Sequence, residues 1–471
     1  MGGLLASLLV IAAQAGGGDR AVILDVPYMG PRWQEFLDGP QDFSFPSSMA
    51  AAMAYVDEDH PYGYRAYMAI CGISFRQCWN PDQAEVTFDN IWIQDDDPSE
   101  PLRRCFDAAG FGYQLLINDD VEPDQSLPAA TPGERVSASG LKDAVIASIG
   151  AGQPVIGISA FGPHVIAGYD HGGDVALGWG QCEGMDDKPA EDPSGYLVFP
   201  DWLARTAGVV LIGDRIDRPD VDDVYREWLR WAVEGMRQPA VAGRATGLAS
   251  FDAWTAALAP GEPLPDDLQG DQLQQRVGVH DLHALGIAEG RAFGGELLER
   301  AADRFADAQE PLSDAAECCW EMHDLIWCLW GVLGGHGPPT EEQRDRFSEP
   351  EVRAELARTV GMLAELDAQV VRSMEVALHR IGEPLADVPN ALSVDDADPD
   401  TALGWRPDHG HENMDIWIRG APAMGWGQGT DHQDVAVLAA ALAPTERPVA
   451  YNDLMGYSGA AFGTDWAGDR E

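Results

Sequence analysis

Histidine and carboxylate side chains gather in a stretch of helical sequence, where their types are suited to binding a metal ion. His280 and His283 share one helical face, and Glu317, Glu321 and Asp324 follow at i, i+4 and i+7 on another. Imidazoles and carboxylates from two helices can hold a metal inside a bundle. The Glu-x-x-His spacing of di-iron bundles is missing, however, and solvated faces and core packing explain these residues better. We therefore predict no metal and no cofactor.

The cysteines form neither a metal-binding pattern nor a disulfide pattern. The seven of them stand at positions 71, 78, 105, 182, 318, 319 and 328. Their number is odd, their spacing is irregular, and no Cys-x-x-Cys pair occurs, which argues against zinc sites and a disulfide framework. We expect most of them to be small buried residues.

The helices and strands that would position any reactive side chain can be predicted from two patterns of apolar residues. Helical patterns in the first part of the chain cover a helix opened by Ser47 or Ser48 as its N-cap, residues 101–109 and residues 140–149. Apolar runs separated by Gly, Asp and Pro predict strands at 21–26, 111–117, 154–159, 164–169, 174–179, 195–199 and 208–213. We expect the last five of these strands to form an antiparallel meander. From about residue 219 the apolar spacing becomes i, i+3, i+4, which predicts helices at 221–236, 247–258, 272–308, 312–333 and 351–378.

One part of the chain occurs twice. Residues 47–79 recur without a gap at 434–466. The matches include Tyr64, Met68, Gly72, Phe75 and Trp79, which become Tyr451, Met455, Gly459, Phe462 and Trp466. Self-similarity at a fixed offset indicates a duplicated unit. We expect the shared positions to be structural, and the second copy to be truncated.

The predicted meander resembles a known superfamily. It contains Pro154-Val155 after a helix, a strand headed by His164 that continues into Gly168-Tyr169-Asp170, and a short strand with Gly178-Trp179. On these motifs, residues 22–213 resemble papain-like domains of the double-glycine-peptidase type and the N-terminal domain of butirosin-type acyltransferases. The helical part is similar to the region after this domain in a set of uncharacterised bacterial proteins. The resemblance implies an α+β papain-like fold.

The resemblance also implies roles for polar residues of the meander. A papain-like site needs a His that takes the proton of the nucleophile and a polar group that orients this His. His164 fits the position of the base. Asp170, Asp174 or Gln181 would orient it or complete an oxyanion hole. The alternative is that His164 is a hydrogen-bonded residue on a strand.

The nucleophile is missing from the place where the family carries it. A papain-like thiolate stands at a helix N-terminus, where the helix dipole lowers its pKa. No Cys starts the first predicted helix, so Ser44, Ser47 or Ser48 would have to act instead, and capping by Ser47 or Ser48 is the alternative. Cys71 is the nearest thiol, but its counterpart in the repeat is Ser458, an exchange that indicates packing beside a tight turn.

The charge balance restricts the partners. The chain has 78 acidic and 30 basic residues, a net charge of −48. Such a surface repels nucleic acids and anionic membranes, so we expect neither as a partner. The acidic residues are spread along the whole chain, which is typical of a halophilic protein whose self-repulsion is screened by salt.

The N-terminal residues resemble a signal peptide. An apolar run from Leu4 to Ala13 is followed by small residues like those of a cleavage site, although no Lys or Arg precedes it. This pattern favours export over residues 1–18 being a simple extension of a cytoplasmic protein. The run is too short to span a membrane as a stable helix.

Together these patterns predict an α+β protein with a papain-like domain over 20–217, a helical domain over 218–382, an acidic linker over 383–409 and a truncated second papain-like domain over 410–471. The favoured function is that of a catalytically degenerate peptidase-like protein that binds a peptide or small molecule in a papain-like cleft. One alternative is an active hydrolase or acyltransferase in which His164 activates a Ser hydroxyl. Another is a structural or interaction protein. The sequence does not predict an oligomeric state.

Overall fold

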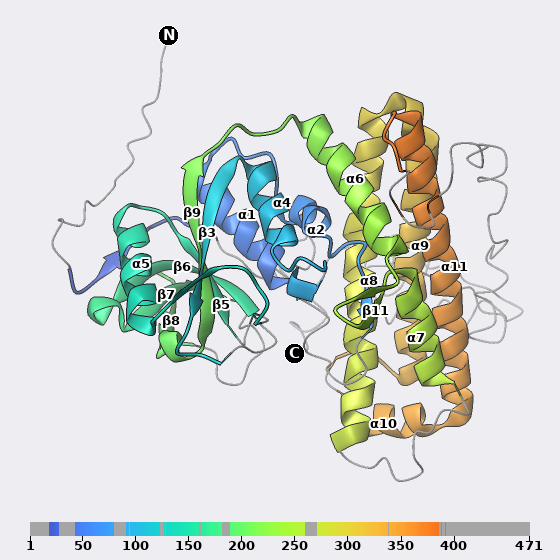
Figure 1. The fold of residues 1–471 in the computed structure, drawn as a ribbon. Coiled ribbons are helices and arrows are strands. Elements are labelled where there is room, and N and C mark those ends of the chain that lie inside the picture. The colour runs from blue at the N-terminus through green and yellow to red at the C-terminus, as the bar shows by residue number, and fades with distance from the viewer. Residues whose placement is uncertain are drawn as a thin grey trace, which may run out of the picture.

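The computed structural model describes residues 18–27, 43–79, 91–93, 95–122, 127, 129–159, 162–180, 189–259, 271–337, 339–385, 388 and 391. Figure 1 shows an α/β region, which we define as residues 21–215, beside a helical region, residues 221–380. The predicted mixture of a sheet with helices and an all-helical C-terminal part is confirmed. The signal-like residues 1–17 and the second copy of the repeat lie outside the described residues, and the papain-like identity and the domain boundaries stay predictions.

One mixed sheet forms the centre of the α/β region. In the described part of the chain its strands follow the order β4-β3-β9-β5-β6-β7-β8, with β1 paired to β6. Among the described strands of this sheet, β3 and β4 alone pair in parallel. The bounds are β1 (Ala21–Val22), β3 (Phe111–Asn118), β4 (Glu134–Val136), β5 (Val155–Ser159), β6 (Gly162–Asp170), β7 (Val175–Trp179), β8 (Leu197–Pro200) and β9 (Thr206–Arg215).

The predicted meander is confirmed for β5 to β8 but not for the last strand. Strand β9 does not pair with β8; it returns to lie between β3 and β5. Its run Val209-Val210-Leu211-Ile212 is apolar without alternation, as expected of a strand that is covered on both faces. Both faces are indeed covered, since Val210 and Val209 are buried in two different apolar clusters.

Helices cover the two faces of the sheet. Helices α1 (Ser44–Val56), α2 (Tyr64–Ile70) and α4 (Glu100–Ala109) share a buried cluster with Ile156 and Val210, so we call this side the α1 face. Helix α5 (Ala138–Gly150) packs through Leu141, Val145 and Ile149 in a cluster with Val155 and Val209. Because strand residues alternate between faces, Val155 and Val209 define the opposite side, the α5 face.

The helical region is built around long antiparallel helices. Its elements are α6 (Val221–Arg237), α7 (Leu248–Leu258), α8 (Asp271–Arg304), α9 (Gln309–Leu333), α10 (Glu341–Ser348) and α11 (Pro350–Arg380), of which α8, α9 and α11 lie side by side in Figure 1. The predicted helix over 272–308 ends earlier, at Arg304, because Phe305 leaves the helical conformation at φ −110° and ψ 82°. No helix in the described residues is long and apolar enough to cross a membrane.

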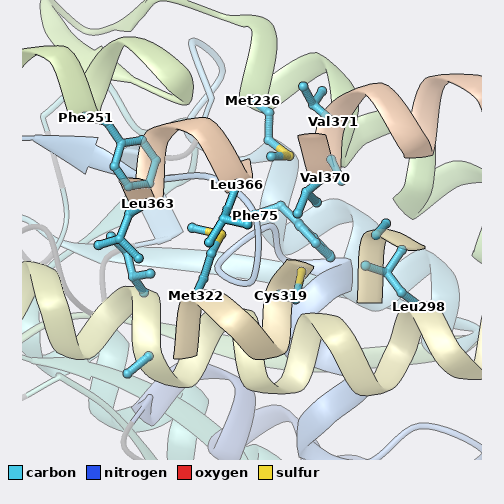
Figure 2. Packing of buried hydrophobic residues seen from close by; sticks show 14 of the residues in the cluster. Phe75, Met236, Phe251, Leu298, Cys319, Met322, Leu363, Leu366, Val370 and Val371 are labelled. Atoms are coloured by element: carbon cyan, nitrogen blue, oxygen red, sulfur yellow. The ribbon is translucent and has the colours of Figure 1, made fainter. Parts of the chain in front are cut away.

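The two regions share a core and a small sheet. Strand β2 (Cys78–Trp79) pairs with β11 (Arg244–Thr246), which in turn pairs with β10 (Ala240–Val241). Phe75, just before β2, is fully buried in the apolar cluster of the helical region. Figure 2 shows its ring beside Leu366, Val370 and Cys319. Phe75 therefore belongs to the helical core although it comes from the N-terminal part of the sequence, whereas Cys71 and Ile73, just before it, are buried on the α1 face.

Candidate functional site

The candidate nucleophiles lie in the first turns of α1, and all three are buried. The predicted N-cap role of Ser47 or Ser48 is wrong, because α1 starts at Ser44 and Phe43 is its N-cap residue. The helix can start this early because Pro46 lies in the first turn, where its missing N–H is not needed. Ser48 Oγ donates a hydrogen bond to the Ser44 carbonyl at 2.8 Å. Ser47 Oγ is buried and has no hydrogen-bond partner within the described chain.

His164 lies near the start of β6 in a tight environment. It is directly opposite Gly157 of β5, and its imidazole ring occupies the space that a Cβ atom at Gly157 would need. The ring packs against Phe199 with a centroid distance of 5.6 Å. Nδ1 donates to the Gly162 carbonyl at 3.4 Å, the ring's only hydrogen bond among the described residues. Burial lowers the pKa of His164 to about 4, so the imidazole is neutral at physiological pH.

The strand register places His164 and the serines on opposite faces of the sheet. Residues paired directly across an antiparallel ladder point to the same side, so His164 shares a face with Gly157, two residues after Val155 on the α5 face. Ile156 and Ile158 point the other way and pack with α1. The structure therefore does not bring His164 together with Ser44, Ser47 or Ser48.

Two of the three residues proposed to orient His164, Asp170 and Asp174, are engaged elsewhere. Asp170 is six residues further along the strand, about 20 Å away at the usual rise. Its carboxylate accepts hydrogen bonds from the His171 amide at 2.7 Å and from Arg20 at 2.9 Å, which hold the pKa of Asp170 below its ordinary value. Asp174 pairs with Lys142 at 3.0 Å. Gln181 lies outside the described residues.

The histidines of the helical region pack among aromatic rings, apart from the acidic residues of α9. His280 Nδ1 accepts a hydrogen bond from Trp254 Nε1 at 3.0 Å, and the His283 ring meets Trp254 and Trp79 edge to face. Burial lowers the pKa of each imidazole to about 3. Neither histidine belongs to a cluster of three or more metal-type ligands in the described chain. The only such cluster there, Asp19, Asp170 and His171, lies largely exposed at the end of β6, where Asp170 already pairs with Arg20.

A different group of residues stands out once the fold is known: the segment from Tyr64 to Trp79, which we call the docking segment. The Phe75 ring stacks on Trp228 of α6 with a centroid distance of 5.7 Å and an interplanar angle of 8°. The Trp79 ring stacks on Trp254 of α7 at 5.9 Å. Aromatic contacts of this kind add to the free energy of burial. The segment is thus anchored in the helical region by two aromatic side chains.

Polar contacts hold the backbone of the docking segment. Arg291 of α8 is fully buried and donates to the carbonyl of Ser74 and, at 3.5 Å, to that of Phe75. Its Nε donates to Asp367 Oδ1 of α11 at 2.7 Å, so the guanidinium charge is paired inside the bundle. A planar guanidinium can serve several acceptors at once, and the buried carbonyls need such donors. Arg291 therefore recognises the main chain, a role that the sequence did not suggest.

The start of the docking segment is fixed by Tyr64 and Gly72. The Tyr64 hydroxyl donates to Glu289 of α8, and its ring meets Phe293 edge to face at 5.4 Å. Gly72 has a φ of +92°, and a Cβ atom there would lie 3.0 Å from the Trp231 ring. Only glycine combines this conformation with so close an approach. Four of the five identities within residues 64–79, all except Met68, therefore contact the helical region.

Comparisons with protein families and with curated proteins add no guide to this site. No protein-family model matches the chain, and no curated protein is significantly similar to it. The papain-like resemblance thus rests on the sequence motifs alone.

Proposed function

We propose that this protein acts by binding a peptide and not by catalysis. In this proposal the α/β region is a catalytically degenerate papain-like domain, and the helical region is the part that recognises peptide. The observation that carries the proposal is the set of contacts by which the helical region binds the docking segment. Two aromatic anchors, Phe75 and Trp79, enter the bundle, and the buried Arg291 donates to the main-chain carbonyls at the first of them. Deep aromatic anchors joined to main-chain hydrogen bonds are how peptide-binding domains gain affinity.

The positions of the candidate catalytic residues support a non-catalytic role. A base must lie within hydrogen-bond reach of its nucleophile, directly or through one water. The buried serines of α1 and the neutral His164 face opposite sides of the sheet. The hydrolase alternative requires that a fluorophosphonate probe label the wild type and not His164→Ala or Ser47→Ala. We expect no labelling of any of the three, and labelling that depends on His164 would overturn the proposal.

Peptide recognition can be tested in the full-length chain. The variant Phe75→Ala/Trp79→Ala removes both anchors of the docking segment and opens its site. A fluorescent peptide of residues 62–79 should bind this variant saturably, and binding to the wild type, whose site is filled, should be at least tenfold weaker. Fluorescence anisotropy measures both, and circular dichroism checks that the variant is folded. Equal affinity for the two proteins would refute the proposal.

A milder variant covers the case in which the double substitution unfolds the protein. Phe75→Leu keeps an apolar side chain and Trp79, so it loosens the docking segment with a smaller loss of packing. The same peptide should then raise the thermal midpoint of this variant and leave the wild type unchanged, because only an opened site gains stability from a ligand. A peptide with the Phe75 and Trp79 positions replaced by Ala is the matched control.

A further inference from the structure

Two indole rings form a corner at the C-terminal end of α9, which we call the aromatic corner. The ring centroids of Trp327 and Trp330 lie 5.0 Å apart, with an interplanar angle of 77°. The imidazole of His336, from the turn after α9, lies in this corner, with its centroid 4.7 Å from that of Trp330 and 5.8 Å from that of Trp327. Trp330 is buried, whereas His336 is exposed. The corner is therefore covered by a side chain that has solvent to rotate into.

A carboxylate without a cationic partner lies beside the aromatic corner. Asp281 of α8 is buried, and its Oδ2 accepts a hydrogen bond from the Gly337 amide at 3.1 Å. No Arg, Lys or His of the described chain forms an ion pair with Asp281, although buried charges are normally paired. Burial raises the pKa of Asp281, and the Gly337 amide, His336 and the Trp330 indole act against this rise, so both rings lie near the carboxylate. Trp330 Nε1 still lacks a hydrogen bond of normal geometry and is a buried polar atom without a partner.

The turn that carries His336 allows its ring to leave the corner. Gly335 and Gly337, on either side of it, have φ values of +135° and +106°. A Cβ atom at either position would meet nothing within 4 Å, so these glycines permit a backbone conformation and leave open space around the turn. The hydrogen bond from Gly337 to Asp281 holds the main chain in place while the His336 side chain changes rotamer.

We propose that the aromatic corner and Asp281 form a binding site for a small organic cation of the alkylammonium type, which displaces the His336 ring. The faces of Trp327 and Trp330 attract a weakly hydrated cation, and the Asp281 carboxylate supplies the opposite charge. His336, itself cationic when protonated, holds the place of the ligand. A metal ion fits less well, because Ca²⁺ and Mg²⁺ need several oxygen ligands and Asp281 belongs to no cluster of three metal-type ligands in the described chain. The site is separate from the docking segment, and the inference does not depend on peptide binding.

Choline and its neutral isostere 3,3-dimethyl-1-butanol distinguish a cation site from an apolar one. Isothermal titration calorimetry on the full-length wild type in 1 M NaCl compares the two; the Debye length there is about 3 Å, so diffuse attraction to the acidic surface is screened. We expect choline to bind saturably and the neutral isostere to bind about tenfold more weakly or worse. The NMR signals of the His336 ring protons, assigned with His336→Ala, should shift on addition of choline, because the imidazole leaves the indole faces.

Three variants locate the site. His336→Ala should bind choline about threefold tighter or more, because the corner no longer has to be vacated. Asp281→Asn keeps an acceptor for the Gly337 amide and removes the charge, so choline binding should weaken about tenfold or more. Asp303→Asn makes the same change at an exposed position of α8 and should leave choline binding unchanged. Circular dichroism checks that each variant is folded.

The inference is overturned if neither the wild type nor His336→Ala binds choline. It is also overturned if 3,3-dimethyl-1-butanol binds as tightly as choline, because the corner is then an apolar pocket, or if Asp281→Asn and Asp303→Asn weaken binding equally, because the attraction then comes from the general surface charge. If Asp281→Asn unfolds, the comparison of the two probes on the wild type and the shift of the His336 signals decide the matter. The peptide assays of the docking segment are unaffected by any of these results.

Discussion

The effect of Gly294→Ala on the free energy of unfolding should depend on whether the Phe75 ring is present. Gly294 of α8 lies beneath the Phe75 ring, and a Cβ atom added there would lie 2.9 Å from Cζ. The ring is fully buried and stacked on Trp228, so it has no open space to move into. Gly294→Ala therefore presses the ring against its neighbours. In a Phe75→Ala background the same methyl group enters space that the ring has left.

The magnitude depends on three opposing effects. Phe75→Ala removes a buried aromatic side chain and should cost about 3–5 kcal/mol. Adding a methyl group to a filled core costs about 1–3 kcal/mol, whereas replacing Gly by Ala inside a helix gains about 1 kcal/mol. Gly294→Ala should thus be neutral or destabilising by up to about 2 kcal/mol in the wild type. With Phe75→Ala present, it should stabilise by about 1 kcal/mol.

Urea unfolding of the two single variants, the double variant and the wild type measures this cycle. Gly361→Ala on α11 is the control, because a Cβ atom there meets nothing within 4 Å and should stabilise both backgrounds equally. The insertion of Phe75 against α8 would be refuted if Gly294→Ala changed the free energy of unfolding by the same amount with and without the ring.

Two further perturbations probe buried charge. The pKa of His164 is lowered to about 4 and the pKa values of His280 and His283 to about 3 by burial, against 6.5 in an unfolded chain. The unfolded state therefore binds more protons just below pH 6.5, and the free energy of unfolding should drop by about 1.4 kcal/mol per imidazole, about 4 kcal/mol from these three together, between pH 7.5 and 5.5. The half-buried His60, whose pKa is also lowered to about 4, adds to this drop. Urea unfolding at the two pH values checks this, and equal stability would contradict it. Arg291→Met should cost about 3–5 kcal/mol because it leaves Asp367 buried without its partner. Adding Asp367→Leu should restore part of the thermal midpoint, and a further fall would show that the loss does not come from the unpaired charge.

The local pattern of apolar residues predicted most of the helices and strands, but it did not predict which of them lie next to one another. The apolar runs that became β5, β6 and β7 and the spacing that became α8 and α11 could be read from the sequence, because each depends on its own residues. The insertion of β9 between β3 and β5 could not, since strand order is decided by packing over the whole sheet.

The candidate site shows the same limit more sharply. The motif around His164 was correctly assigned to a strand, but the face that the side chain occupies depends on register with β5. A shift of one residue in register reverses the face, and no local signal fixes it. The docking segment did leave a signal, the repeated Tyr64, Gly72, Phe75 and Trp79. The repeat did not reveal the partner surface, which comes from helices more than a hundred residues later.

The most direct measurement of the central claim is native-state hydrogen exchange on full-length wild type and Phe75→Ala. The amides of Cys71, Gly72 and Arg76 donate to carbonyls of the docking segment itself. A short segment does not keep such turns once it has left its site, so these amides exchange when the segment leaves. If this segment is a separable peptide ligand of the bundle, Phe75→Ala should speed exchange at these amides by about a hundredfold or more, while the central amides of α8 and α11 keep their slow exchange. Equal acceleration in the segment and in both helices would mean that the segment cannot leave without unfolding the bundle, and would contradict the account.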